Sequence, residues 1–393
     1  MALSQQFYIN NRKKLGELLE NNSLTIVFSG REIQMTEDAN YPFFGNNNFY
    51  YLTGIREPEL VLLMIKNEKG EVIQSLFTEE ADPLKEKWVG KKISKDQAAA
   101  ISGLETVYYR KDLPKEVGRL ATVKTLYFDF KTPKHQSFKT EDTDFKNIIK
   151  QAELKDLHPV MAGMRLIKTA EEISAITKAN HVTKAGIAEI KKIMKPEIYE
   201  YELAAFFEYF VKKAGTEGLA FETIVASGKN ATVLHYVSNR CPLKSGDLVL
   251  FDLGARVDGY CGDLSRTLAV NGEMTKQQEV LYEIVDAVQK EMFKAYKPGA
   301  VMKDLQNLTQ ELFLEKCCSA GFVPANNDIT EFYYHGIGHP LGLDTHDLRP
   351  AGDLILAPGM VMTVEPGLYL EKLGIGIRIE DDVVITDSGC TVL

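Results

Sequence analysis

Short apolar runs alternating with helical segments mark the first part of the chain. Runs rich in β-branched, aromatic and aliphatic residues predict strands at 23–29, 48–54, 59–67, 71–77 and 125–130. Residues 83–88 and 94–102 have helical patterns, and the spacing of Leu15, Leu18 and Leu19 predicts a helix near the N-terminus. Alternation of strands and helices is typical of an α/β domain.

The pattern changes near His158-Pro159, which predicts two domains of residues 1–159 and 160–393. Thr169, with Glu172 three residues later, forms a capping box that opens a long amphipathic helix. Helices dominate to about residue 213, strands follow, and two more helices run from about 276 to 320 before the closing strands. We therefore expect an α+β second domain, in which helices cover one face of a sheet.

The first strands of this second domain predict a β-hairpin that carries two aspartates. The apolar segments DLVLFDLG and SRTLAV flank a short turn. Depending on whether the turn is centred on residues 257–258 or 258–259, Asp252 lies opposite Asp263 or opposite Ser265. Because side chains alternate along a strand, both registers leave the two aspartates on one face.

The last strands predict a second hairpin with two more acids. The segments GMVMTVEPGLYL and GIGIRIEDDVVIT flank a turn near residues 371–374. A turn centred on residues 372–373 makes Glu365 and Glu380 direct cross-strand partners, with Arg378 on the same face. Two hairpins that each offer two acids indicate a pseudo-symmetric sheet with metals on its concave side.

Four carboxylates on such strands form a set of ligands that is rich in oxygen and free of sulfur. Asp252 follows four apolar residues, and Glu365 lies in a similarly apolar strand. Burial of these charges costs several kcal/mol each unless they are paired or coordinated. Four carboxylates balance the charge of two divalent cations, and two such cations can activate water for hydrolysis. The sequence therefore predicts a dinuclear metal site.

Four histidines lie in motif-like surroundings. His335 and His339 have the spacing of a helical metal pair, but the glycines between them and the following proline argue against a helix. His339 alone suits a metal ligand, which completes the set with the four acids. His235, His335 and His346 suit hydrogen-bond donors around a substrate carbonyl and its tetrahedral intermediate. The histidines without such surroundings are expected to be structural: His135, His158 and His181.

Composition narrows the functional classes. The net charge of −9 and pI of about 5.5, without a basic stripe, argue against a nucleic-acid partner. No apolar run is long enough to span a membrane, and the N-terminal segment is polar where a signal peptide is apolar. Five cysteines form neither a disulfide framework nor a zinc motif. We expect a cytoplasmic protein.

The metal motifs, with HGIGHPLGLDTHD and VEPGLY, resemble those of the pita-bread metallopeptidases. Within them the chain looks like aminopeptidase P, the Xaa-Pro aminopeptidases, with prolidase close by. Residues 31–63 and 87–90 resemble the creatinase-type N-terminal domain of aminopeptidase P, so the resemblance covers nearly the whole chain. It implies a second domain built on a curved antiparallel sheet with helices on its convex face.

The resemblance also implies a role for each metal ligand. Asp263 and Glu380 would bridge two divalent ions, Asp252 would bind the second, and His339 and Glu365 would complete the first. Hard oxygen ligands favour Mn²⁺-type ions over a thiolate zinc site, and Mn²⁺ is the ion that the resemblance leads us to expect. A hydroxide bridging the metals would attack the scissile carbonyl, with Glu365 as the proton shuttle.

The remaining site residues would bind substrate. By resemblance, His235 and His346 would hold the carbonyl oxygen and the intermediate, and His335 and Arg378 would line the proline-side pocket. The substrates would be peptides with proline at the second position. An X–Pro bond is a tertiary amide with no N–H and a rigid ring, so its recognition requires a dedicated pocket.

Other readings are a prolidase that cleaves only Xaa-Pro dipeptides, and a non-catalytic pita-bread peptide-binding module. The module is disfavoured because such relatives lose metal ligands. A creatinase-like amidinohydrolase is also disfavoured, because that branch lacks the metal set.

The resemblance further implies a homo-oligomer, a dimer or a tetramer. In it Trp88 would cover a neighbouring subunit's pocket or serve as an ordinary core aromatic. Phe44 and Asn48 depart from the family's arginine and acid in a loop that closes over the substrate.

Overall fold

The computed structural model describes residues 3–118, 123–133, 152–324 and 328–393. These residues divide into two compact units, one ending at Met164 and one beginning at Arg165. Helix α7 (His158–Leu166) runs through both this division and the boundary predicted after residue 159. His135 lies outside the described residues.

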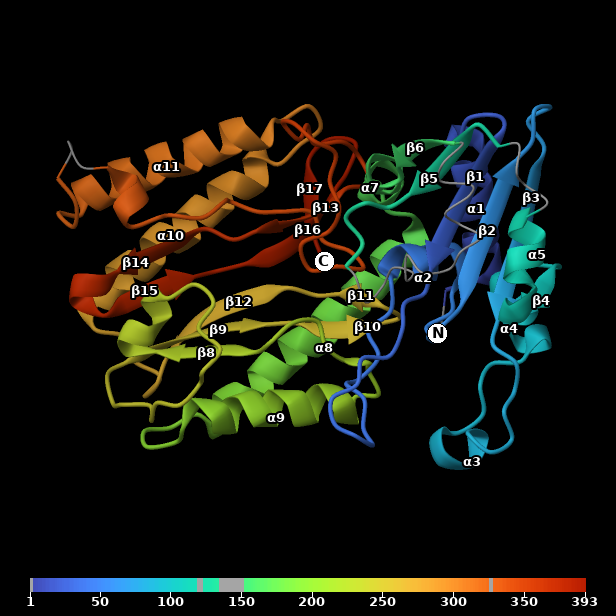
Figure 1. Ribbon diagram of the computed structural model, residues 1–393. Helices are drawn as coiled ribbons and strands as arrows, with labels where there is room; N and C mark the ends of the chain where they lie inside the picture. Colours follow the sequence, from blue (N-terminus) through green and yellow to red (C-terminus); the bar gives the residue numbers. More distant parts are fainter. Residues whose placement is uncertain (1–2, 119–122, 134–151, 325–327) are drawn as a thin grey trace. The chain divides into compact units, whose positions relative to one another are not determined.

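The N-terminal unit is built on a mixed six-stranded sheet, ordered β4-β3-β2-β1-β5-β6 (Figure 1). Strand β2 pairs antiparallel with β1 and β3, and the other neighbours are parallel. The strands are β1 (Ser23–Phe28), β2 (Val61–Lys66), β3 (Val72–Thr78), β4 (Val107–Tyr109), β5 (Thr125–Phe128) and β6 (Glu153–Asp156). The helices are α1 (Gln5–Leu18), α2 (Asn47–Thr53), α3 (Glu86–Val89), α4 (Lys95–Ser102), η1 (Arg110–Asp112) and α5 (Leu113–Gly118).

The strand predicted at 48–54 is wrong, because this segment forms helix α2. Asn46 caps its first turn by accepting a hydrogen bond from the Asn48 amide at 2.8 Å, and Gly54 ends it in the left-handed region with φ 75°. Its tyrosines pack on α1, where Phe7 contacts the ring of Tyr51 edge-on. Aromatic residues favour strands only weakly, so the two caps and the packing decide the conformation.

The C-terminal unit contains antiparallel strands throughout its described residues. Two three-stranded sheets, β12-β9-β8 and β13-β16-β17, carry or border the acids, and the pair β14-β15 and the three-stranded sheet β11-β10-β7 extend them. The strands are β7 (Gly218–Leu219), β8 (Ile224–Ser227), β9 (Leu248–Leu253), β10 (Ala255–Val257), β11 (Tyr260–Cys261), β12 (Leu264–Ala269), β13 (Val361–Val364), β14 (Gly367–Leu370), β15 (Ile375–Arg378), β16 (Asp381–Ile385) and β17 (Cys390–Val392).

Two helix pairs cover these strands on opposite sides (Figure 1). Helices α8 (Ala170–Ile193) and α9 (Glu200–Lys213) pack on β8 and β9 through a core that includes Phe207, Val249 and Phe251. Helices α10 (Lys276–Ala295) and α11 (Met302–Ser319) pack on the last strands. Short 3-10 turns complete the unit: η3 (Gly228–Thr232), η4 (Ile329–Glu331) and η5 (Glu371–Leu373). The capping box of Thr169 and Glu172 is confirmed, as are the two helices predicted within 276–320.

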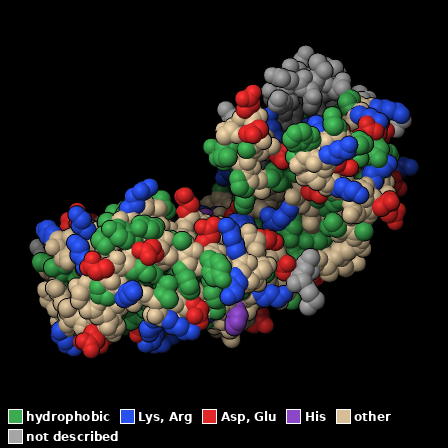
Figure 2. All heavy atoms as spheres, turned by 90° about the horizontal axis from the view of Figure 1, so that it is seen from below, with side chains coloured by type: hydrophobic (Ala, Val, Ile, Leu, Met, Phe, Trp, Pro, Cys, Tyr) green, Lys and Arg blue, Asp and Glu red, His purple; other side chains and the backbone are tan. Residues whose placement is uncertain are grey.

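The surface mixes charges of both signs. On the face drawn in Figure 2, Lys and Arg side chains are interspersed with Asp and Glu. Among the residues that the structure describes, no helix combines the length and the apolar character that crossing a bilayer requires.

Candidate metal centre

The first hairpin adopts the second of the two predicted registers. Asp252 lies opposite Ser265, and β10 and β11 continue the same pairing toward a two-residue turn. Asp258 and Gly259, the two turn residues, both have positive φ (51° and 85°). Asp-Gly favours this mirror-image turn, whose twist matches that of antiparallel strands, and the turn thereby sets the register.

The second hairpin keeps the predicted register but interrupts its strands at the acids. Val364 pairs with Asp381 and Gly367 pairs with Arg378, so Glu365 and Glu380 occupy opposite positions between these two pairs. Neither glutamate belongs to a paired strand. Pro366 has no N–H to donate to a ladder, and the predicted continuous strand divides there into β13 and β14.

The two hairpins bring the predicted ligands together. Ligand atoms of Asp263, His339 and Glu380 all lie within 4.8 Å of one another. His339 Nε2 is also 3.5 Å from Glu365 Oε1. Asp252 is connected to this cluster through Arg378, whose Nη2 donates to Asp252 Oδ2 at 2.6 Å. The Oγ of Ser265 donates to Glu380 Oε2 at 2.6 Å and accepts from Arg378 Nε at 2.8 Å.

This concentration of buried acid is electrostatically unfavourable without cations. The pKa of Asp263 is raised well above its usual range by burial and by the neighbouring carboxylates, first that of Glu380. Burial, followed by the charges of Glu365 and Asp252, raises the pKa of Glu380 in the same way. Oδ1 of Asp252 is buried and accepts no hydrogen bond within the described part of the chain. Divalent cations would neutralise these charges and use this oxygen.

His339 has the protonation state that a metal ligand needs. Its Nδ1 lies 3.1 Å from the carbonyl oxygen of Pro340, which places the proton on Nδ1 and leaves the Nε2 lone pair toward the carboxylates. Burial lowers the pKa of this imidazole and favours its neutral form. Four carboxylates and one neutral imidazole therefore fit divalent cations that prefer oxygen ligands.

A hydrogen-bonded chain runs from Arg378 through Tyr369 to His335. Arg378 Nη1 donates to the Tyr369 hydroxyl at 3.0 Å, so this hydroxyl donates in turn to His335 Nε2 at 2.8 Å. His335 Nδ1 lies 2.8 Å from its neighbour's carbonyl oxygen at Gly336. Sequence reasoning missed Tyr369, although it follows Glu365 by four positions and strand alternation puts both on one face.

The other two histidines border the same region. The rings of His346 and His339 lie with their centroids 3.9 Å apart. Burial and the neighbouring His339 lower the pKa of His346. His235 lies in the exposed segment after η3, close enough that its charge contributes to lowering the pKa of both His335 and His346, after the larger effect of burial.

The run Glu380-Asp381-Asp382 resembles a surface charge run when taken alone, yet all three residues are buried. Asp382 Oδ2 accepts the backbone N–H of Asp263 at 3.0 Å, and Arg266 Nη2 donates to Asp381 Oδ1 at 2.7 Å. These acids therefore connect the second hairpin to the first and fix the position of a predicted ligand.

One of the two departures noted in the N-terminal unit, Asn48, has a local structural explanation. Asn48 is buried, and its amide donates to Asp129 Oδ2 at 2.8 Å. An acid at position 48 would face this carboxylate, so the amide suits its surroundings within the unit. Phe44 is exposed, and Trp88 on α3 is 84% exposed, which excludes a core position for it within this unit.

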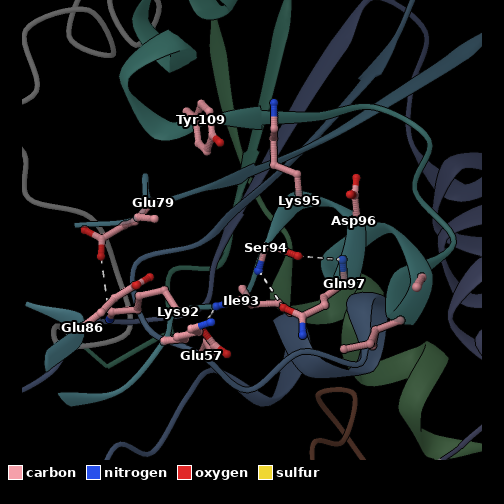
Figure 3. A pocket seen from close by; sticks show the side chains of 14 residues that line it. Glu57, Glu79, Glu86, Lys92, Ile93, Ser94, Lys95, Asp96, Gln97 and Tyr109 are labelled. Carbon is pink, nitrogen blue, oxygen red and sulfur yellow. Dashed lines mark hydrogen bonds and ion pairs between the residues drawn. The ribbon is translucent and has the colours of Figure 1, made fainter. Parts of the chain in front are cut away.

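A hollow of about 950 Å³ lies in the N-terminal unit, which contains none of the predicted metal ligands (Figure 3). Among the charged residues that line it, Lys92 lies 3.7 Å from Glu79, and Lys95 lies over the ring of Tyr109. The Ser94 side chain accepts a hydrogen bond from the Gln97 N–H at the start of α4. The hollow differs from the acid cluster of the C-terminal unit because lysines lie among its carboxylates.

Comparisons with known families agree with the fold. Residues 174–387 match the model of metallopeptidase family M24, and residues 8–127 match that of the aminopeptidase P N-terminal domain. The chain belongs to metallopeptidase family M24, in its aminopeptidase P branch. It is therefore a hydrolase, and a peptidase whose family uses divalent metals.

Individual relatives span almost the full chain. The Xaa-Pro aminopeptidase of Escherichia coli is 32% identical over 98% of this chain and 94% of its own. Xaa-Pro aminopeptidase 3 of Homo sapiens is 30% identical over 100% of this chain and 83% of its own. The structure of E. coli aminopeptidase P with the inhibitor Pro-Leu superposes with a TM-score of 0.93 at 31% identity, covering 100% of this chain and 95% of that one.

Proposed function

We propose that this protein is an Xaa-Pro aminopeptidase, which hydrolyses the bond between an N-terminal residue and a following proline. The observation that carries the proposal is the meeting of Asp263, His339 and Glu380 within 4.8 Å, beside Asp252 and Glu365, in a chain similar to Xaa-Pro aminopeptidases over nearly its whole length. The inhibitor named for the E. coli structure begins with proline, as the second product of such a cleavage does.

The proposed metal ligands are Asp252, Asp263, His339, Glu365 and Glu380, and the proposed ions are two Mn²⁺. When bound, two divalent cations lower the pKa of a shared water molecule and act as Lewis acids toward the scissile carbonyl. The donor set supports this choice because it contains no thiolate and consists mainly of carboxylates, which suit hard cations.

Glu365 is the residue that we assign to proton transfer. Its Oε1 accepts a hydrogen bond from Thr363 at 3.2 Å, and its Oε2 lies 3.7 Å from His335 Nδ1. Burial raises the pKa of this carboxyl, and the cationic Arg378 opposes that shift. A carboxylate positioned in this way can carry a proton from water to the leaving amine.

The histidines and Arg378 would bind the substrate around this centre. His346 and His235 would donate hydrogen bonds to the carbonyl oxygen as negative charge develops on it. His335 lies between the rings of Tyr333 and Tyr369, at centroid distances of 5.0 and 5.4 Å. These two rings are buried and support the His335 imidazole, which would itself contact the rigid proline ring.

A prolidase, restricted to Xaa-Pro dipeptides, is the second candidate. It is favoured by the Xaa-Pro dipeptidase of Pyrococcus furiosus, which is 38% identical over 63% of this chain. The aminopeptidase P N-terminal match favours the first candidate, because it covers a part of the chain that is additional to the M24 match.

Incubation with Ala-Pro and with Ala-Pro-Ala, with Mn²⁺ or with a chelator, separates the two candidates. We expect Mn²⁺-dependent release of alanine from the tripeptide. Cleavage of the dipeptide alone would favour the prolidase, and cleavage of neither peptide with metal bound would contradict both candidates. The matched control is Asp263→Ala, which should abolish metal binding and hydrolysis together.

We also propose a cytoplasmic homo-oligomer, a dimer or a tetramer. Leu84, Trp88 and Val89 support an assembly because each is more than two-thirds exposed around α3. Light scattering of wild type and of Trp88→Ala tests this part of the proposal. A wild-type protein of monomer mass would contradict it.

A further inference from the structure

A buried ionic cluster lies beside the loop that carries His339 and His346. Lys168 Nζ is 3.0 Å from Asp347 Oδ2, and Arg165 Nη2 bonds to Asp347 Oδ1. The side chains of these residues are only 1–3% exposed. Burial alone would raise the pKa of Asp347, yet the charges of Arg165 and Lys168 hold it below its usual value. Asp347 is therefore an ionised group fixed by two cations.

Backbone contacts connect Asp347 to the proposed metal ligand. The Asp347 N–H donates to the Pro340 carbonyl at 2.9 Å. The same carbonyl oxygen lies 3.1 Å from His339 Nδ1 and fixes the imidazole tautomer. A shift of Asp347 would therefore move the acceptor that orients His339.

Close packing leaves this loop little freedom to adjust. A Cβ built on Gly342 would come within 2.1 Å of Asp347 Oδ2, so the carboxylate lies directly against the loop backbone. The N–H of Leu348 donates to Asp347 Oδ1 at 2.9 Å. His346, next to Asp347 in the chain, has its ring against that of His339. Asp347 thus contacts the segment between the two histidines twice, with its carboxylate at Gly342 and with its backbone N–H at Pro340.

We propose that Arg165, Lys168 and Asp347 form a buried anchor that positions His339 for metal binding and His346 for substrate binding. The anchor residues are positioning residues, since they act through Pro340 and the loop. The inference rests on the proposed function for the role of His346, and on the metal site alone for the role of His339. The position of Lys168 is itself fixed by its backbone, whose N–H donates to the Gly359 carbonyl at 2.9 Å.

The test compares Asp347→Asn and Lys168→Met with Asp344→Asn. The control residue Asp344 also bonds to Arg165, at 2.7 Å, but its side chain is 35% exposed, whereas that of Asp347 is 1% exposed. Metal-free protein is titrated with Mn²⁺ by calorimetry, and kcat and KM are measured on Ala-Pro-Ala. Loss of a group that orients a metal-bound histidine weakens metal affinity about 10–100-fold. We expect that loss for Asp347→Asn, a smaller loss in the same direction for Lys168→Met, and a change within about threefold for Asp344→Asn.

Each outcome decides the inference. Asp347→Asn leaves two buried cations with one acid fewer, so circular dichroism first establishes that it folds. If it does not, Lys168→Met, which leaves the Arg165–Asp347 pair intact, gives the decision. Wild-type Mn²⁺ affinity in the folded variants would overturn the anchor. A wild type that binds Mn²⁺ without cleaving peptide would refute the proposed function alone, since the calorimetric comparison would still decide the anchor. A wild type that binds no Mn²⁺ would overturn both.

Discussion

Replacement of Glu200 by glutamine should loosen the loop that carries His235. Glu200 is fully buried in the first turn of α9, where its carboxylate accepts five hydrogen bonds. Oε1 accepts from the Ser227 N–H, the Ser227 hydroxyl and the Asn230 amide at 2.6–3.0 Å. Oε2 accepts from the Tyr236 hydroxyl at 2.8 Å and the Cys241 N–H at 2.9 Å. One carboxylate therefore organises residues 227–241.

The magnitude follows from the donors that glutamine cannot satisfy. Its NH₂ group must take the place of either Oε1 or Oε2, and each of these oxygens accepts from a backbone N–H that cannot become an acceptor. Oε2 has the fewer donors, and at that position two hydrogen bonds to a charged group are lost, each worth about 1.5–3 kcal/mol. The Tyr236 hydroxyl can rotate to accept from the new amide, which regains about 1 kcal/mol. The net local cost is therefore about 2–5 kcal/mol.

Hydrogen exchange of the amides in 227–241 measures this cost, because the two units need not unfold together in a denaturant titration. A local loss of about 2 kcal/mol corresponds to about 30-fold faster exchange. The matched control is Glu202→Gln, two positions along the same helix. Glu202 is exposed and caps the Tyr199 N–H at 3.0 Å, a bond that the glutamine carbonyl retains.

The loss of activity should be larger for Glu200→Gln than for Glu202→Gln, as for the exchange rates. Glu200→Gln should lower kcat/KM on Ala-Pro-Ala with little change in Mn²⁺ affinity, since His235 is not a proposed ligand. Equal exchange rates in the Glu200 and Glu202 variants would refute the reasoning, because the buried donors would then have found other acceptors.

Three further predictions test the electrostatics of the C-terminal unit. Tyr369→Phe removes the hydroxyl that accepts from the charged Arg378, a bond worth about 1.5–3 kcal/mol, and should lower kcat about 10–100-fold with calorimetric Mn²⁺ affinity unchanged. A weakened Mn²⁺ affinity would contradict this separation. Burial raises the pKa of Glu172, so the native state holds its proton to higher pH than the unfolded state, and stability from this group is lost as pH rises through the folded-state value. Glu172→Gln keeps the capping box without this loss, so its stability relative to wild type in urea titrations should increase from about pH 4 to about pH 7, and a constant difference would contradict the assignment. At a metal concentration of 100 Kd, bound metal stabilises the native state by about 2.7 kcal/mol, so chelation at neutral pH should lower the melting temperature by about 5–10 °C. Asp263→Ala should melt at the same temperature with and without chelator.

Local patterns predicted most of the residues that the structure brings together in the candidate site. Alternation along two hairpins predicted the faces of Asp252, Asp263, Glu365 and Glu380, because a turn fixes an entire register. The sequence left two registers open for the first hairpin, and the positive φ of its turn residues selects one. Tyr369 was within reach of the same reasoning.

Long-range partners were beyond such reasoning. Asp347 meets Lys168 across 179 positions, and Glu200 meets Cys241 across 41, so no local spacing indicates either contact. The charge run at 380–382 is buried because α10 and the first hairpin cover it, and neither is close to it in the sequence. Helix α2 shows the opposite limit: its aromatic composition predicted a strand, while caps and packing on α1 gave a helix.

The two-residue turn at Asp258-Gly259 has a consequence for how the chain can change in length. Insertion or deletion of a single residue there would reverse the face of every side chain on one arm, and Asp252 and Asp263 would then project from opposite sides of the sheet. Exchange of one turn residue for another leaves the count intact and costs only local backbone strain. The metal centre is therefore more sensitive to an insertion or deletion in this turn than to a substitution of one of its two residues.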